Sequence, residues 1–154
     1  MITMIWCEDL NHGIGKNNQI PWKIKEEMNH FRSFTTGHIL VSGRRTMESL
    51  NNKPLPNRTH LVLTRNHDYH PDPRVKVYHD YQQILKDYQN HDLIIIGGKD
   101  IYQLFLPYAD QLVISTLNQA YDCDLYMKLD LSSFNKVKSQ KHDLFTINWY
   151  NRKK

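Results

Sequence analysis

The chain has 154 residues, of which 40% are hydrophobic and 23% charged, and a formal net charge of +4 at pH 7. This length suits one domain with one sizeable core, and the composition excludes a disordered, fibrous or low-complexity chain. The positive charge favours anionic partners, but the basic residues form no stripe interleaved with exposed aromatic residues, so nucleic acid is not an expected partner.

The first residues, MITMIWCEDL, are typical of a buried strand and lack the features of a signal peptide or a membrane-spanning segment. We therefore expect a cytoplasmic protein with no membrane contact. Cys7 and Cys123 lie far apart in the sequence and belong to no paired motif, so we expect reduced thiols. The terminal run from Arg152 to Lys154 is expected to be a solvated tail.

Short apolar segments rich in β-branched residues alternate with amphipathic segments of helical length. We expect strands at residues 2–7, 38–42, 60–64, 75–78, 93–96, 112–117, 134–140 and 144–151, and helices at residues 24–35, 44–50, 80–88 and 99–106. The alternation predicts an α/β fold with a mixed, mainly parallel central sheet of about eight strands flanked by about four helices. The close spacing of the last two strands predicts a C-terminal antiparallel hairpin.

Two of the expected strands run into glycine and then into a helix, at Gly43 and at the Gly97-Gly98 pair. Free backbone N–H groups at such junctions can bind an anion, although the glycines can equally serve only to permit tight turns. The first junction adds groups that suit a phosphate, namely Arg44, Arg45 and Thr46. A third strand ends in Leu63-Thr64-Arg65, and this end would join the same rim of a parallel sheet and suit a phosphorylated dinucleotide.

Glu27 interrupts the apolar stripe that Ile24, Met28, Phe31 and Phe34 form along the first helix. On an apolar face, burial disfavours the ionised carboxylate and raises its pKa, so that it can hold a proton near neutral pH. The alternative is that Glu27 turns to the edge of the helix and is solvated. Periodicity leaves both interpretations open.

Several short motifs occur in one order along the whole chain, and their order and spacing together are specific. They are Gly13-Ile14-Gly15, Ile20-Pro21-Trp22, Glu27 with Phe31, Gly43-Arg44-Arg45-Thr46, Glu48-Ser49, Pro54-Leu55-Pro56 with Arg58, Leu63-Thr64-Arg65, and Ile96-Gly97-Gly98 with Ile101-Tyr102. In these motifs the sequence resembles bacterial dihydrofolate reductase. The resemblance implies a single domain over residues 1–154, with an adenosine-binding lobe at roughly residues 38–88.

The resemblance implies NADPH-dependent reduction of 7,8-dihydrofolate to 5,6,7,8-tetrahydrofolate, by hydride transfer with protonation of the pterin ring. This reaction supplies tetrahydrofolate for one-carbon and thymidylate metabolism. The implied catalytic residues are Glu27, which binds the pterin, and Trp22, which orders water beside it. The implied substrate pocket also contains Ile5, Cys7, Met28, Phe31, Leu50, Arg58 and Ser115, with Arg58 gripping the carboxylate of the substrate tail. Antifolates are expected ligands, and a monomer is the expected state.

The same resemblance assigns the cofactor contacts. Arg44, Thr64 and Arg65 are similar to the cluster that recognises the adenosine 2′-phosphate. Thr46 and the turn Gly97-Gly98-Lys99, with a cis peptide between its glycines, would hold the pyrophosphate. The other implied contacts are Cys7, Ile14, Gly15, Ile20, Gly43, Arg45, Leu63, Ile96, Asp100, Ile101 and Tyr102, and no metal is expected. Residues 15–21 would form the loop that closes over the nicotinamide.

The sequence departs from the usual family pattern at several positions. Glu27 stands where aspartate is usual and Cys7 where alanine is common, and Cys-Asp-Leu-Tyr replaces Gly-Asp-Thr-Phe at residues 123–126. The last change affects the contact between the closing loop and its partner loop.

Two other functions are alternatives to the reductase. One is a pyrimidine reductase of riboflavin biosynthesis, which would not need Glu27 with Trp22 and Arg58, and the other is a non-catalytic nucleotide- or RNA-binding module.

Overall fold

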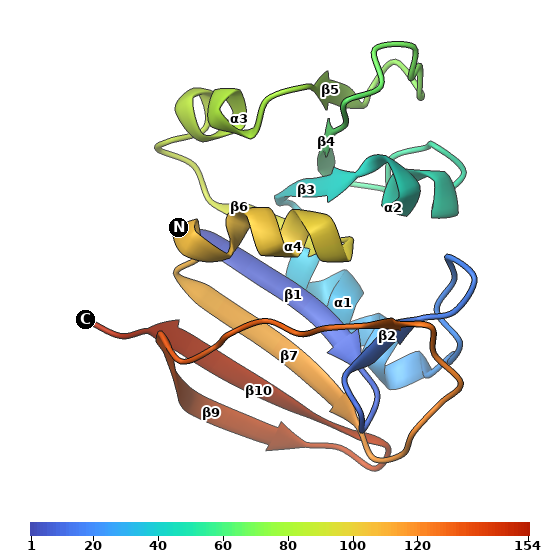
Figure 1. Ribbon diagram of the computed structural model, residues 1–154, viewed down its shortest axis with the longest axis vertical. Coiled ribbons are helices and arrows are strands. Elements are labelled where there is room, and N and C mark those ends of the chain that lie inside the picture. Colours follow the sequence, from blue (N-terminus) through green and yellow to red (C-terminus); the bar gives the residue numbers. More distant parts are fainter.

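The computed structural model describes residues 1–154 and alternates strands with helices along most of the chain (Figure 1). The strands are β1 (Ile2–Glu8), β2 (Gly13–Gly15), β3 (Ile39–Gly43), β4 (Thr59–Leu63), β5 (Lys76–Tyr78), β6 (Leu93–Gly97), β7 (Gln111–Leu117), β8 (Leu125–Tyr126), β9 (Phe134–Lys141) and β10 (Phe145–Arg152). The helices are α1 (Lys25–Thr35), α2 (Arg44–Ser49), α3 (Tyr81–Asp87), α4 (Lys99–Phe105) and the short 3-10 helix η1 (Leu106–Tyr108).

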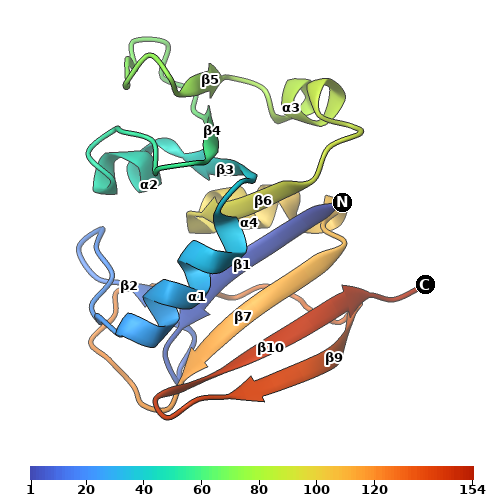
Figure 2. The same cartoon turned by 180° about the vertical axis from the view of Figure 1, so that it is seen from behind.

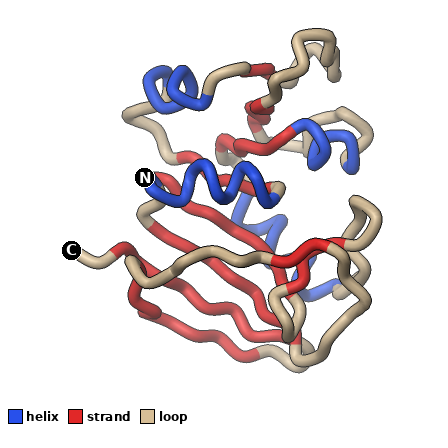
Figure 3. Tube along the Cα trace, viewed as in Figure 1, coloured by secondary structure: helices blue, strands red, loops and turns tan.

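The central sheet has eight strands in the order β5-β4-β3-β6-β1-β7-β10-β9. Figure 3 draws the strands in red and the helices in blue. All pairs from β5 to β7 are parallel, whereas β10 runs antiparallel to both β7 and β9. These observations confirm the predicted mixed, mainly parallel sheet with its C-terminal hairpin. They also explain the continuous apolar run of β6, because a central parallel strand is covered on both faces.

Helices cover both faces of the sheet. On one face, α3 and α4 contribute Ile84 and Phe105 to a core with Met4, Leu61 and Ile95. On the other face, Phe31 and Phe34 of α1 pack against a second buried cluster that contains Ile5, Leu40 and Val113. Figure 2 shows the side of the sheet that α1 covers. Because both faces are covered over the parallel strands, the strand ends are the open part of this region, whereas β9 is exposed along most of its length.

One detail of the predicted helix stripe is wrong. Met28 does not join the apolar face of α1, because its side chain is 44% exposed. The inner face is formed instead by Ile24, Phe31 and Phe34. Together with Glu27 these positions are spaced by about three or four residues, whereas Met28 lies about 100° round the helix from Glu27. The correction therefore places Glu27 on the inner face.

Two short strands and η1 were not predicted. β2 and β8 pair with each other outside the main sheet, through Gly13 with Tyr126 and Gly15 with Leu125. Strands of three and two residues are too short to show a periodic pattern. They form because two loops far apart in the sequence meet in space.

No helix is long and apolar enough to cross a membrane. Both cysteines are free thiols, with Cys123 buried and Cys7 half-buried, as the sequence predicted.

The prediction of a fully solvated C-terminal tail is wrong for Arg152. This residue belongs to β10, and its guanidinium donates hydrogen bonds to the carbonyl oxygens of Ala109 (2.7 Å) and Leu106 (2.6 Å). It also lies 4.6 Å from the centre of the Phe134 ring. Arg152 therefore fastens the end of the hairpin to η1 and the residue that follows it, and packs on the first residue of β9.

Replacing Arg152 with methionine should lower the free energy of unfolding by about 1–3 kcal/mol, because two carbonyl groups lose their charged donors. The urea midpoint should fall without a change in the m value. The matched control is Lys153→Met at the exposed neighbouring position, which should change stability by less than about 0.5 kcal/mol. Equal effects of the two variants would contradict this role of Arg152.

Candidate active site

Glu27 lies on the sheet-facing side of α1 and is half-buried. Its neighbours along this side, Ile24 and Phe31, pack against the buried cluster that contains Ile5 and Trp22. Burial raises the pKa of the Glu27 carboxyl above its ordinary value of 4.5, and a hydrogen bond with the Cys7 side chain lowers the pKa by a smaller amount. The sequence interpretation of Glu27 as a solvated residue at the edge of the helix is therefore excluded.

Cys7 and Ser115 occupy neighbouring strands beside this carboxyl. They are paired in register across β1 and β7, so their side chains lie on the same face of the sheet. Burial, followed by the charge of Glu27, raises the pKa of the Cys7 thiol, which therefore stays protonated and can donate a hydrogen bond. The hydroxyl of Ser115 is buried and has no hydrogen-bond partner within the protein. It remains available to a ligand.

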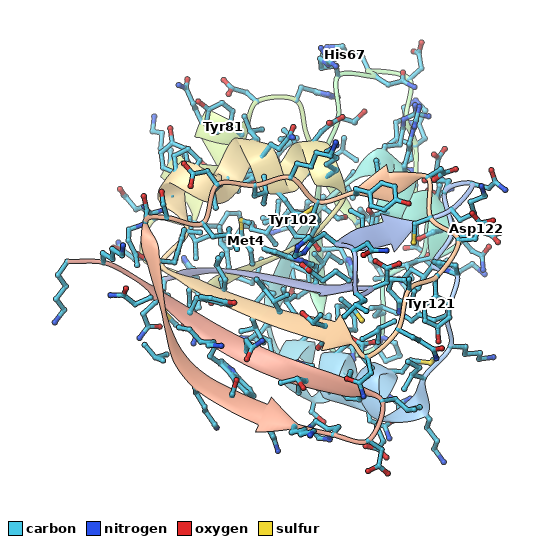
Figure 4. All side chains as sticks on the ribbon, turned by 60° about the horizontal axis from the view of Figure 1, so that its bottom comes forward. Met4, His67, Tyr81, Tyr102, Tyr121 and Asp122 are labelled. Carbon is cyan, nitrogen blue, oxygen red and sulfur yellow. The ribbon has the colours of Figure 1, made fainter.

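Tyr102 of α4 lies behind the site, on the face of the sheet opposite to Glu27. Its side chain is 4% exposed, and its hydroxyl donates a 2.6 Å hydrogen bond to the carbonyl oxygen of Ile5. Burial, followed by the charge of Glu27, raises the pKa of Tyr102, so its hydroxyl stays a donor. Figure 4 shows Tyr102 beside Met4 in the centre of the molecule.

Arg58 is held at the far end of α1. Its Nε donates to Thr35 Oγ1 at 3.0 Å, and its terminal nitrogens donate to the Pro56 carbonyl oxygen at 3.1 Å and Thr36 Oγ1 at 3.1 Å. These contacts fix the plane of the guanidinium before any ligand binds. A fixed guanidinium suits recognition of a carboxylate.

The two glycine junctions meet at one rim of the sheet. Ser42 pairs with Gly97, and a Cβ atom on Gly43 would lie 4.0 Å from the backbone nitrogen of Gly98. The Thr46 hydroxyl lies beside both glycines of the second junction, 3.5 Å and 3.8 Å from Cβ atoms built on them. Gly97 has a φ of +123°, which favours glycine, and the peptide bond to Gly98 is cis, as the resemblance implied.

This rim fits the phosphates of a dinucleotide. Neither α2 nor α4 has a side chain that caps its first turn, so backbone N–H groups next to the two glycine junctions are free to bind an anion. The absence of Cβ atoms lets a ligand approach the backbone closely.

The basic residues extend the same rim. Gly43 pairs with Leu63 across β3 and β4, so Arg44 and Thr64 follow neighbouring strand ends. Arg44 makes a 3.3 Å ion pair with Glu48, with both side chains partly exposed. A hollow of about 570 Å³ lies next to this part of the rim and away from Glu27; it is lined by His67, Tyr69, His70, Pro71, Asp72, Pro73, Val75, Val77 and His79.

The structure does not bring every predicted residue into this arrangement. Ile20 is 66% exposed and, like Met28, belongs to no buried cluster. Leu50 packs against the cluster of Met47, Val62 and Val75 below α2. The remaining predicted cofactor contacts lie on the rim or on β2 with differing exposure: Gly15 and Leu63 are buried, Ile14, Ile96, Lys99 and Ile101 are half-buried, and Arg45, Arg65 and Asp100 are exposed.

Two buried acids at the end of β1 were not singled out from the sequence. Glu8 is 5% exposed, accepts a 2.7 Å hydrogen bond from Trp6 Nε1 and pairs with the His12 ring. Asp9 is 1% exposed and bonds to backbone groups of two loops. The signal was present, since two carboxylates directly follow a buried strand. Most of the hydrogen-bond partners of these two acids, however, lie in loops whose sequence shows no periodic pattern.

The comparisons with known proteins agree with this geometry. The family model described as dihydrofolate reductase matches residues 1–152. The chain belongs to the dihydrofolate reductase family. It is 46% identical to a dihydrofolate reductase of Ureaplasma parvum, over 100% of this chain and 99% of that protein. This family membership favours the predicted reductase over the two other functions considered from the sequence.

Two further similar proteins extend the comparison. A Mycoplasmoides gallisepticum protein named segregation and condensation protein A is 44% identical over 99% of this chain, which corresponds to 26% of that protein. The solved dihydrofolate reductase of Enterococcus faecalis, complexed with NADP(H) and RAB-propyl, superposes with a TM-score of 0.93 at 29% identity, over 100% of this chain and 97% of that one. The fold of the family is therefore preserved along the full chain.

Replacing Glu27 with glutamine should stabilise the ligand-free protein at about pH 8 and leave stability unchanged at about pH 4. The folded pKa of Glu27 is raised, so its stabilising contribution is present below the ordinary value of 4.5 and lost as the pH rises through the folded pKa. Urea midpoints at the two pH values measure the difference. Glu26→Gln, at the exposed neighbouring position, is the control and should change little; an equal gain at both pH values would contradict the burial argument.

Proposed function

We propose that this protein reduces 7,8-dihydrofolate to 5,6,7,8-tetrahydrofolate with NADPH, and so supplies tetrahydrofolate for one-carbon and thymidylate metabolism. The observation that carries the proposal is Glu27, a half-buried carboxyl of raised pKa that contacts Cys7 in a chain of the dihydrofolate reductase family. An isolated acid of this kind can bind a heterocycle rich in hydrogen-bond donors and favour its protonation.

NADPH, when bound, supplies the hydride. Its pyrophosphate would be held by the Thr46 hydroxyl and the free N–H groups at the junctions of Gly43 and Gly97-Gly98, where the lack of Cβ atoms admits the ligand. Arg44, Thr64 and Arg65 would bind the 2′-phosphate. The lobe at roughly residues 38–88 would hold the adenosine end, supported by the hollow beside this rim.

The residues around Glu27 would orient the pterin and manage its proton. The buried Ser115 hydroxyl offers a hydrogen bond to the ligand, and the Cys7 thiol stays protonated as a donor to the Glu27 carboxyl. Trp22, which is 8% exposed, would keep bulk water away and order a water molecule beside the acid. Together these groups would hold the proton near the ring nitrogen that receives it.

Arg58 would bind the carboxylate of the substrate tail, because its guanidinium is already fixed by Thr35, Thr36 and Pro56. Ile5, Phe31, Met28 and Leu50 would line the substrate between this end and Glu27. Antifolates that share the donor-rich heterocycle should compete for the same residues. We further propose that the protein acts as a monomer, in one domain, in the cytoplasm.

Mixing the protein with NADPH and dihydrofolate should give a loss of reduced-cofactor absorbance that depends on both compounds. No turnover would overturn the proposed function.

Glu27→Gln should retain NADPH binding but lose turnover at neutral pH by at least about 100-fold, because the group that favours protonation is removed. Partial rescue in acid is expected, since solvent then supplies the proton, and unchanged turnover would mean that another residue is the acid.

Replacing Arg44 or Arg65 with alanine should reduce the preference for NADPH over NADH by about tenfold, because a charged partner of the 2′-phosphate is lost. The ratio of kcat/KM values for the two cofactors measures the preference. Arg74→Ala serves as the control, since Arg74 is exposed and pairs with Asp72. A ratio that neither rim variant changes would refute the 2′-phosphate assignment.

A further inference from the structure

Asp9 is a buried carboxylate that takes no direct part in the proposed reaction. Its Oδ1 accepts hydrogen bonds from the backbone nitrogens of Asn11 (2.8 Å) and Gly13 (2.7 Å), and its Oδ2 accepts one from the backbone nitrogen of Tyr121 (2.8 Å). Burial alone would raise the pKa of Asp9, but these hydrogen bonds hold it below the ordinary value. The group is therefore a buried anion satisfied by backbone N–H groups.

The partners of Asp9 come from two segments that are about a hundred residues apart. Asn11 and Gly13 lie between β1 and α1, whereas Tyr121 lies between β7 and β8. Figure 4 labels Tyr121 and Asp122 on this second segment. A Cβ atom on Gly13 would lie only 2.5 Å from the Cys123 sulfur, so the two segments are in direct contact at this point.

Tyr121 connects these two segments to the candidate active site through its contact with Trp22. Its ring meets that of Trp22 edge-on, with ring centres 5.3 Å apart and an interplanar angle of 60°. Trp22 belongs to the buried cluster against which Cys7 packs. Cys7 is in turn the neighbour of Glu27 that lowers the pKa of its carboxyl. These contacts connect Asp9 through Tyr121 and Trp22 to the acid.

We propose that Asp9 is a positioning residue for the reductase site: its carboxylate fastens the segment containing Tyr121 to the loop after β1 and thereby holds Trp22 beside Glu27. This inference rests on the proposed function. Other contacts also join the segments. Backbone hydrogen bonds link Leu10 with Gln119 at 3.2 Å and Met127 with His12 at 2.8 Å. Further out, Asp124 accepts from the Asn17 nitrogen at 3.0 Å and Lys16 lies 3.6 Å from Asp122, both through exposed side chains. Asp9 differs from these outer carboxylates because its side chain is buried.

Asp9→Asn tests this role with almost no change in shape. The amide oxygen can still accept from Asn11 and Gly13, but the amide NH₂ group replaces the oxygen that accepts from the Tyr121 nitrogen and, at 3.8 Å, from the Cys123 sulfur. The hydrogen bonds that this oxygen accepts from the second segment are therefore lost. We expect kcat to fall about tenfold, while KM for each substrate changes less than about threefold, because one charged hydrogen bond remote from the ligands is removed. Amide hydrogen exchange at Tyr121 should rise about tenfold in the ligand-free protein.

Tyr121→Ala is the second variant, and it leaves the backbone bond to Asp9 in place while removing the ring that packs on Trp22. It should lower kcat by a similar factor, and the double variant should be no worse than about twofold below either single one, because both act through one contact path. Asp130→Asn is the matched control, since its carboxylate accepts only a 2.9 Å bond from the Ser132 nitrogen in an exposed turn. It should leave kcat unchanged.

Two results would overturn the proposal: an Asp9→Asn protein with normal kcat, or additive losses in the double variant. If Asp9→Asn does not fold, Tyr121→Ala tests the proposal by itself. This variant should still lower kcat, and normal turnover of Tyr121→Ala would overturn the proposal. A wild-type protein without turnover refutes the proposed function instead. In that case, normal amide hydrogen exchange at Tyr121 in Asp9→Asn would separately refute the role of Asp9 in joining the two segments. Raised amide exchange would support that role.

Discussion

The candidate site depends on the parallel pairing of β4, β3, β6, β1 and β7. Parallel register aligns the carboxyl ends of these strands, and the helices on both faces leave the strand ends as the open part of the sheet. Register then decides which residues meet: Gly43 with Leu63, Ser42 with Gly97, and Cys7 with Ser115. A shift by one residue would turn each of these side chains to the other face and separate the groups that the reaction needs.

Two buried carboxyl groups, a short distance apart along the chain, show how environment decides chemical role. Glu27 faces an apolar cluster and has only a thiol as a hydrogen-bond partner, so burial dominates and its pKa rises. Asp9 accepts three backbone hydrogen bonds, which outweigh burial and lower its pKa. Burial thus favours the protonated form of the first group, whereas the backbone hydrogen bonds favour the anionic form of the second, which can hold two segments together.

The departures from the family pattern fit together in space. Cys123 is buried against Gly13, where any larger residue in place of the glycine would collide with the sulfur. Cys7 contacts Glu27, so a thiol accompanies the longer carboxylate at the centre of the site. The departures therefore lie at two places: Cys123 packs against the loop after β1, and Cys7 meets Glu27 in the candidate site.

The sequence alone determined the order of strands and helices, the mainly parallel sheet and the family, because these depend on periodicity and on motifs that are local in the chain. It also marked Glu27 as misplaced, yet could not choose between a buried acid and a solvated one. Only the tertiary structure decided that Met28 is exposed in the ligand-free protein, that Arg152 is bound rather than solvated, and that Asp9 joins two loops. The physical reason is the same in each case: burial and hydrogen-bond partners come from segments distant in sequence, whose meeting no local pattern encodes.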